Sequence, residues 1–201
     1  MVVKPDQIVR VTLPPGKALE AIKTSTQIVQ SIVDRGDLHS RDYLERFIDC
    51  LIGEVAECMV IQWLSEQNKY VESAVNKTST TTDIGHDIWL KNMAGEKWRC
   101  SVKSSISWKK NTPTDILNTF TLATNPKEVR DINIQVYFWL ELNSPPRTVV
   151  PSLKNAAIFA WASSKDLSSG SFASYKGEQR KAPDKNLVGL RPMVELLSII
   201  R

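Results

Sequence analysis

The clearest pattern in the chain is a stripe of apolar residues spaced three or four apart between Leu44 and Trp63. Such spacing places the side chains on one face of an α-helix, which repeats about every 3.6 residues. Ser40 precedes the stripe as a candidate N-cap, and Asp42 lies in the first turn, where the helix dipole favours negative charge. The pattern therefore predicts an amphipathic helix over about residues 41–67.

Beyond a polar segment at residues 77–82, the helical spacing gives way to strand patterns. Residues 88–90 are apolar and β-prone, and residues 97–106 alternate between apolar and polar positions, as a strand with one buried face does. A short turn containing Gly95 separates the two segments. The pattern predicts a β-hairpin.

Two later apolar runs, residues 133–142 and 156–162, predict a central strand and a further strand. A helix with loops is expected between residues 112 and 131. The apolar tail at residues 194–200 is expected to pack back on the core. The chain thus begins with a helix, continues with mainly antiparallel strands and ends in mixed structure. This order predicts an α/β or α+β fold with one central sheet covered by helices.

The remaining segments carry weaker patterns. Residues 1–25 contain three prolines and are expected to form an arm before the core, with a short helix over residues 26–35. Residues 164–186 are polar and basic and are expected to form loop structure.

Composition narrows the class of protein. The 201 residues are 42% hydrophobic and 24% charged, which is close to a globular average. The net charge of +4 permits a polyanionic partner without requiring one. The sequence shows neither an apolar run long enough to cross a bilayer nor a signal peptide. Three cysteines without pairing or metal-ligand spacing are expected to be free thiols in a reducing cytoplasm.

The predicted hairpin brings charged side chains together. With its turn near residues 94 and 95, Asp87 lies across from Ser101 to Lys103, provided that the register does not slip by one residue. At 100° per residue, Glu54 falls at the edge of the apolar stripe and is drawn toward the sheet, whereas Glu57 is rotated further toward solvent. An acid from the helix, an acid from one strand and a lysine from the next are therefore expected at one sheet edge.

Such a cluster suits metal-assisted chemistry. Neighbouring carboxylates repel one another, and a divalent cation relieves that repulsion. Mg²⁺ is typically held by one or two carboxylates together with water and substrate phosphate, and it polarises a phosphoryl oxygen. A nearby ammonium stabilises developing charge or positions the attacking water. Two acids and a lysine on a hairpin therefore favour Mg²⁺-dependent hydrolysis of a phosphodiester.

The order of these residues resembles the PD-(D/E)xK nuclease superfamily, which includes many type II restriction endonucleases. A helix glutamate is followed by Gly-His-Asp-Ile at residues 85–88, and thirteen residues separate Asp87 from Ser101-Val102-Lys103. The resemblance covers about residues 44–142. It implies an α/β fold with a central mixed sheet flanked by helices, as in restriction endonucleases.

The resemblance also implies roles for individual residues. Asp87 would be the central metal ligand, Lys103 the catalytic lysine and Glu54 the acid of the first core helix. The backbone carbonyl of Val102 would complete the coordination of Mg²⁺. Ser101 stands where the family usually has its second acid, and a hydroxyl carries no charge. Glu54 is therefore expected to compensate.

Two features of the motif allow alternatives. If Glu54 does not reach the metal, Glu57 or Asp83 is the next candidate to replace the acid that Ser101 lacks. His86 stands where proline often precedes the aspartate, and it has either a catalytic role or none.

Basic and aromatic residues provide candidate contacts to DNA. Trp108 with its two following lysines either stacks on nucleic acid or anchors an interface, and the later basic stretch either contacts phosphates or forms a solvated loop. Arg180 and Arg191 are candidates for reading guanine edges. The candidate DNA-binding residues are Trp108, Lys109, Lys110, Lys176, Arg180, Lys181 and Arg191.

These features predict a single nuclease-like domain that cleaves double-stranded DNA at specific sites. Residues 1–40 would be an arm with a short helix, 41–162 the catalytic core, and 163–201 a basic loop with a packing segment. Cutting both strands of a symmetric site requires two active sites, so a homodimer is expected. The alternatives are a junction-resolving, repair or defence nuclease of the same fold, or a catalytically degenerate DNA-binding subunit.

Overall fold

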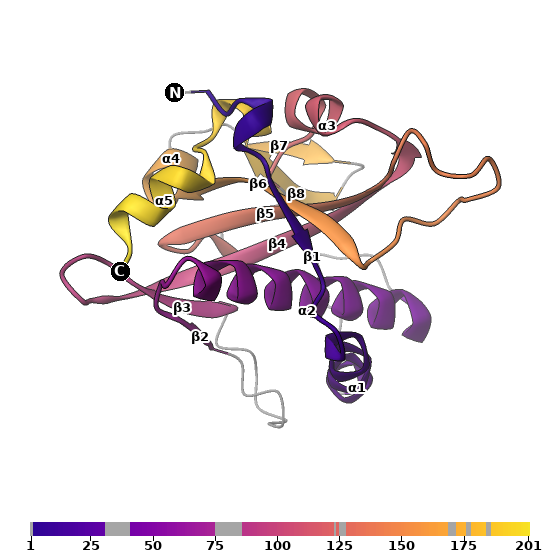
Figure 1. The fold of residues 1–201 in the computed structure, drawn as a ribbon, viewed down its shortest axis with the longest axis horizontal. Helices are drawn as coiled ribbons and strands as arrows, with labels where there is room; N and C mark the ends of the chain where they lie inside the picture. Colours follow the sequence, from indigo (N-terminus) through magenta and orange to yellow (C-terminus); the bar gives the residue numbers. More distant parts are fainter. Residues whose placement is uncertain are drawn as a thin grey trace.

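The protein has an α/β fold, built on a six-stranded mixed sheet with helices on its faces (Figure 1). The computed structural model describes residues 2–30, 41–74, 86–122, 124, 128–168, 172–175, 178–183 and 186–201, with only the backbone at 168, 172–175 and 178–183. The sheet comprises, in spatial order, β1 (Val9–Thr12), β6 (Asn155–Ser163), β5 (Ile132–Leu140), β4 (Lys97–Lys110), β3 (Ile88–Lys91) and β2 (Val71–Ser73). The helices are α1 (Lys17–Val29), α2 (Tyr43–Glu66), α3 (Pro113–Thr119), α4 (Ser164–Ser168) and α5 (Met193–Ile199), with 3₁₀ turns η1 (Pro5–Gln7) and η3 (Leu187–Gly189).

The long helix α2 confirms the helix expected over residues 41–67. Its N-cap is Asp42, because the Asp42 carboxylate accepts from the backbone N–H of Glu45 at 2.8 Å and the Glu45 carboxylate accepts from Asp42 N–H at 3.0 Å. This reciprocal pair is a capping box, and it begins the helix at Tyr43. Ser40, the N-cap expected from the sequence, lies outside the described residues.

The two faces of the sheet carry separate cores. Apolar residues of α2 such as Met59 and Leu64 pack on one face. On the other face, Ile116 and Leu117 of α3 pack with sheet residues that include Phe159. The central strand β5 is buried at all nine positions, as its apolar run predicts. The apolar tail also packs on the core, through Met193, Leu196 and Ile200.

The sheet is mixed because β4 pairs with β3 in antiparallel fashion and with β5 in parallel fashion. Its other neighbouring strands are antiparallel. The hairpin register pairs Ile88 with Cys100 and Leu90 with Trp98. Asp87, just before β3, therefore lies opposite Ser101, which confirms the expected register.

Two expectations are wrong. The N-terminal segment is not an arm before the core, because β1 pairs with β6 and α1 packs against α2, starting nine residues before the helix expected from residue 26. The basic segment is not a plain loop either, because it contains α4 and a two-stranded sheet of β7 (Phe172–Tyr175) and β8 (Glu178–Pro183).

Candidate functional site

The candidate site lies where β3 begins and β4 continues beyond it. Asp87 N–H donates to the carbonyl of Cys100 at 3.0 Å, which anchors Asp87 to β4. One oxygen of the Asp87 carboxylate then accepts from Val102 N–H at 2.6 Å and from the Ser101 hydroxyl at 3.1 Å. The structure thus brings together Asp87, Ser101 and Val102, as the sequence predicts.

The direction of the Val102 backbone matters for ligand binding. In a strand, the N–H and C=O of one residue point to the same edge, since a hydrogen-bonded pair exchanges both groups. The Val102 N–H points to the Asp87 carboxylate, so the Val102 carbonyl also points to that edge of β4. A carboxylate oxygen and a carbonyl oxygen therefore share the edge.

Lys103 is held by an acid that the sequence did not single out. Lys103 follows Ser101 by two residues, so both side chains lie on the same face of β4. The Lys103 ammonium donates to the Glu128 carboxylate at 2.8 Å, and these side chains are 19% and 29% exposed. Glu128 lies just before β5. The parallel pairing of β4 with β5 brings that segment to Lys103. No local sequence motif predicts the contact between Lys103 and Glu128.

The two helix acids are arranged differently from expectation. Glu57 was expected to turn toward solvent, but it is only 4% exposed and its carboxylate accepts from the Ser73 hydroxyl at 2.8 Å. Ser73 pairs with Ile88 in the sheet, so this bond ties Glu57 to the residue that follows Asp87. Glu54 is also buried, at 7% exposure. Glu57 is therefore hydrogen-bonded to the sheet, because β2 places Ser73 beside α2.

The pKa of the Cys100 thiol is shifted by the carboxylates near the site. Burial raises its pKa well above the usual value, and the negative charges of Asp87, Asp131 and Glu57 raise it further. Cys100 faces the α2 side of the sheet, whereas Asp87 and Ser101 belong to the opposite face. Carboxylates from both sides of the sheet thus act on one point of β4, and the thiol remains protonated at neutral pH.

His86, directly before Asp87, is a buried polar residue. Its side chain is 4% exposed, and neither ring nitrogen has a hydrogen-bond partner among the described residues. Its ring meets Trp89 edge-on, with centroids 4.2 Å apart. The stacking accounts for its position, and no contact assigns it a chemical role.

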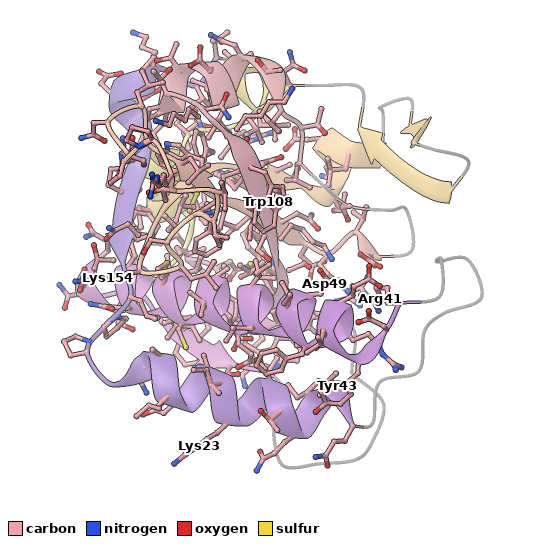
Figure 2. The ribbon with its side chains drawn as sticks, turned by 90° about the vertical axis from the view of Figure 1, so that its right-hand side faces the viewer. Lys23, Arg41, Tyr43, Asp49, Trp108 and Lys154 are labelled. Atoms are coloured by element: carbon pink, nitrogen blue, oxygen red, sulfur yellow. The ribbon has the colours of Figure 1, made fainter. Side chains whose placement is uncertain are left out.

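The expected aromatic contact lies further along β4. Trp108 and Lys109 sit at an irregularity of the β4–β5 pairing, between the pairs of Ser107 and Lys110, and Trp108 is 57% exposed. Bulges of this kind redirect side chains. Figure 2 shows Trp108 on β4, above α2. The Lys110 ammonium donates to the Ser144 carbonyl at 2.8 Å, which leaves Trp108 and Lys109 as the outward-facing pair.

The other expected DNA contacts divide into three cases. Lys176 lies outside the described residues, as does the reserve acid Asp83. Arg180 and Lys181 lie on β8, where only the backbone is described. Arg191 is engaged within the chain: its partly exposed guanidinium donates to both oxygens of Asp166, at 2.8 and 3.0 Å.

The Arg191–Asp166 pair shifts the acid strongly. Partial burial by itself would raise the pKa of Asp166, but hydrogen bonds from Arg191 and Ser163 outweigh it and hold the pKa at about 2. The guanidinium also lies over the ring of Trp161, 5.2 Å from its centroid. These contacts assign Arg191 to the stability of the fold rather than to base recognition.

Replacing Arg191 by alanine is expected to lower the free energy of unfolding by about 1 kcal/mol at pH 7, since both side chains are partly exposed and water screens the pair. The folded-state pKa of Asp166 lies below its unfolded value of 3.8, so this contribution is present above pH 4 and is lost as the pH falls toward 2. Urea unfolding at several pH values measures it. Arg147→Ala, in an exposed turn, is the control; weaker DNA binding by Arg191→Ala with unchanged stability would contradict the assignment.

The donors at the site are chemically suited to Mg²⁺. Asp87 and Glu128 offer carboxylates and Val102 a carbonyl, and Mg²⁺ prefers such hard oxygen ligands. Within the described part of the chain, however, no three His, Cys, Asp or Glu side chains are grouped closely enough to hold a metal ion. This donor set fits an ion bound through one or two carboxylates and completed by water and phosphate.

Fold and site together define an α/β protein in which one strand of a mixed sheet, β4, carries an acid–hydroxyl pair, Asp87 with Ser101, and a lysine–acid pair, Lys103 with Glu128. Comparison with known proteins adds no relative, because no family model, curated protein or solved structure matches the chain. None of the described helices has the length and apolar character needed to span a membrane.

Proposed function

We propose that this protein is a Mg²⁺-dependent endodeoxyribonuclease that hydrolyses phosphodiester bonds of double-stranded DNA. The proposal is supported chiefly by one observation. The Asp87 carboxylate is oriented by Ser101 and Val102, and Lys103 lies on the same face of β4. The resemblance of these residues to the PD-(D/E)xK superfamily suggests a sequence-specific type II restriction endonuclease.

In this mechanism, Asp87, the Val102 carbonyl and Glu128 would hold Mg²⁺, which would supply a Lewis acid for a phosphoryl oxygen of the scissile phosphate. Ser101 keeps the Asp87 carboxylate in place by donating its hydroxyl hydrogen. Lys103 positions the attacking water or stabilises charge on the phosphate, and its pairing with Glu128 holds the ammonium near the face where the phosphate would sit.

Glu128 is preferred over Glu54 as the acid that replaces the missing carboxylate at position 101. Glu128 contacts the catalytic lysine directly, at 2.8 Å. Glu57 is bonded to Ser73 on the α2 side of the sheet, the face opposite Asp87 and Ser101. Glu54, buried on the same helix at 7% exposure, is the acid that the resemblance suggested.

The test is cleavage of a supercoiled plasmid of known sequence. The protein is incubated with Mg²⁺ or with EDTA, and products are resolved on a gel. Discrete linear fragments with Mg²⁺ alone would support restriction, and cleavage confined to branched or damaged DNA would support a junction-resolving, repair or defence nuclease. The proposal would be overturned if the protein cleaved neither plasmid DNA nor branched or damaged DNA in the presence of Mg²⁺.

A homodimer is part of the same proposal, because two sites are needed to cut both strands. Apolar side chains are exposed on both α1 and the start of α2, where Leu19, Leu44 and Ile48 are 66%, 67% and 46% exposed. Figure 2 shows the two helices side by side, with Tyr43 at the start of α2. Sedimentation velocity measures the oligomeric state, and a monomer on a cleaved symmetric site would contradict this part.

One observation favours a second candidate, a DNA-binding subunit without catalysis. The Lys103 ammonium is already neutralised by Glu128, and no three metal-ligating side chains of the described residues are grouped. Such a protein would bind duplex DNA with an affinity that falls with salt, because Lys109 and other cations displace counterions from phosphates. DNA binding without Mg²⁺-dependent cleavage would favour this candidate.

A further inference from the structure

A pocket of about 390 Å³ lies away from the acid–lysine cluster, between the start of α1 and the middle of α2. Its walls come from the β1–α1 turn, from both helices and from the segment leading into β6. The residues that line it are Leu13, Pro14, Pro15, Gly16, Ala18, Ile22, Leu51, Val55, Leu153 and Lys154.

The β1–α1 turn gives the pocket its shape. Leu13 N–H donates to the Lys154 carbonyl at 2.8 Å, which joins the turn to the β6 segment. Gly16 has a φ of +82°, a left-handed conformation that favours glycine, and no atom lies near the position of an added Cβ. The turn therefore holds its wall of the pocket open without any side chain filling it.

The pocket is apolar except for one charge. Leu13 and Val55, at 9% and 2% exposure, form its inner wall, and Ile22 at 42% exposure forms part of its outer rim. Lys154 is the only lining residue with an ionisable side chain, and no described carboxylate forms an ion pair with it. Figure 2 shows Lys154 near the β1–α1 junction, whereas Lys23 lies on the outer side of α1.

We propose that this pocket binds a small amphiphile with an apolar chain and a carboxylate head, of the chemistry of a medium-chain fatty acid. Removing a chain of apolar carbons from water into apolar walls is favourable, and the Lys154 ammonium pairs with the carboxylate. A volume of 390 Å³ accommodates roughly a dozen non-hydrogen atoms, because a water molecule occupies about 30 Å³ in the liquid. Decanoate has this size. The site is independent of the proposed nuclease activity.

The test uses decanoate and the neutral, equally long decanol as probes, both below the concentration at which they form micelles. Titration of the protein with labelled methyl groups is expected to shift the signals of Ile22, Leu51, Val55 and Leu153 in a saturable way. Lys154→Met should weaken decanoate binding about fivefold and leave decanol binding unchanged, as expected for one exposed charge pair. Lys23→Met is the matched control and should bind both probes like the wild type.

A second variant tests the position of the chain. Ala18 lines the pocket and is exposed, so Ala18→Trp fills the space without disturbing the core and should abolish the binding of both probes. Equal binding of decanol and decanoate by the wild type would overturn the role of Lys154. Shifts that do not saturate, or that persist in Ala18→Trp, would overturn the site itself.

Discussion

Replacing Asp87 by asparagine is expected to lower the rate of Mg²⁺-dependent DNA cleavage by at least about a hundredfold, a loss typical of removing one electrostatic group from an active site. The amide oxygen still accepts from Val102 N–H and from the Ser101 hydroxyl, so the local structure should be kept. What is lost is the negative charge proposed to bind the metal. Plasmid cleavage measured over time gives the rate.

The matched control for this variant is Asp131→Asn. Asp131 is also an acid beside β4, but its carboxylate accepts from the backbone N–H of Arg99 at 2.9 Å and not from Ser101 or Val102. Its cleavage rate should stay close to that of the wild type. Equal rates for Asp87→Asn and the wild type would remove Asp87 from the mechanism, even if the protein cleaves DNA.

The second large effect is expected at Glu128. Glu128→Gln keeps a hydrogen-bond acceptor for Lys103 but removes the charge, so cleavage should fall by about ten- to a hundredfold and Mn²⁺ binding should weaken in parallel. Adding Ser101→Asp to this variant restores a carboxylate on the same face of β4. The double variant should regain most of the cleavage rate and of the Mn²⁺ affinity, which electron paramagnetic resonance measures without any substrate.

The single variant Ser101→Asp provides the control for this cycle. It places a second negative charge against Asp87, which repels it in the absence of a cation. Its melting temperature should therefore rise with added Mg²⁺ more than that of the wild type. A double variant that binds Mn²⁺ no better than Glu128→Gln would show that Glu128 positions Lys103 and does not replace the missing acid.

The local elements of the fold were predictable because they follow from short-range patterns. The stripe from Leu44 to Trp63 predicted α2 to within two residues at its start, and the alternation after Gly95 predicted the hairpin. The register followed from the shortness of the turn, since few residues are available to change the pairing. This is why Asp87 was correctly placed against Ser101.

The elements that the sequence did not predict depend on distant pairing. β1 is four residues long and forms only against β6, so its residues resemble an arm when considered alone. β2 has three residues, and its Ser73 is what turns Glu57 into a buried, hydrogen-bonded acid. Helical periodicity predicts on which face of its own helix a side chain lies. It does not predict which distant strand packs over that side chain and buries it.

By itself, then, the chain's order of residues determined that Asp87 meets Ser101 across the hairpin, with Lys103 on the same face of β4, because a tight turn allows few alternative pairings. Tertiary structure alone decided which other charges join them. Glu128 reaches Lys103 because β5 runs parallel to β4, and Arg191 pairs with Asp166 of α4, two contacts that each span 25 residues. Contacts of this length depend on how sheets and helices pack, which no local pattern encodes.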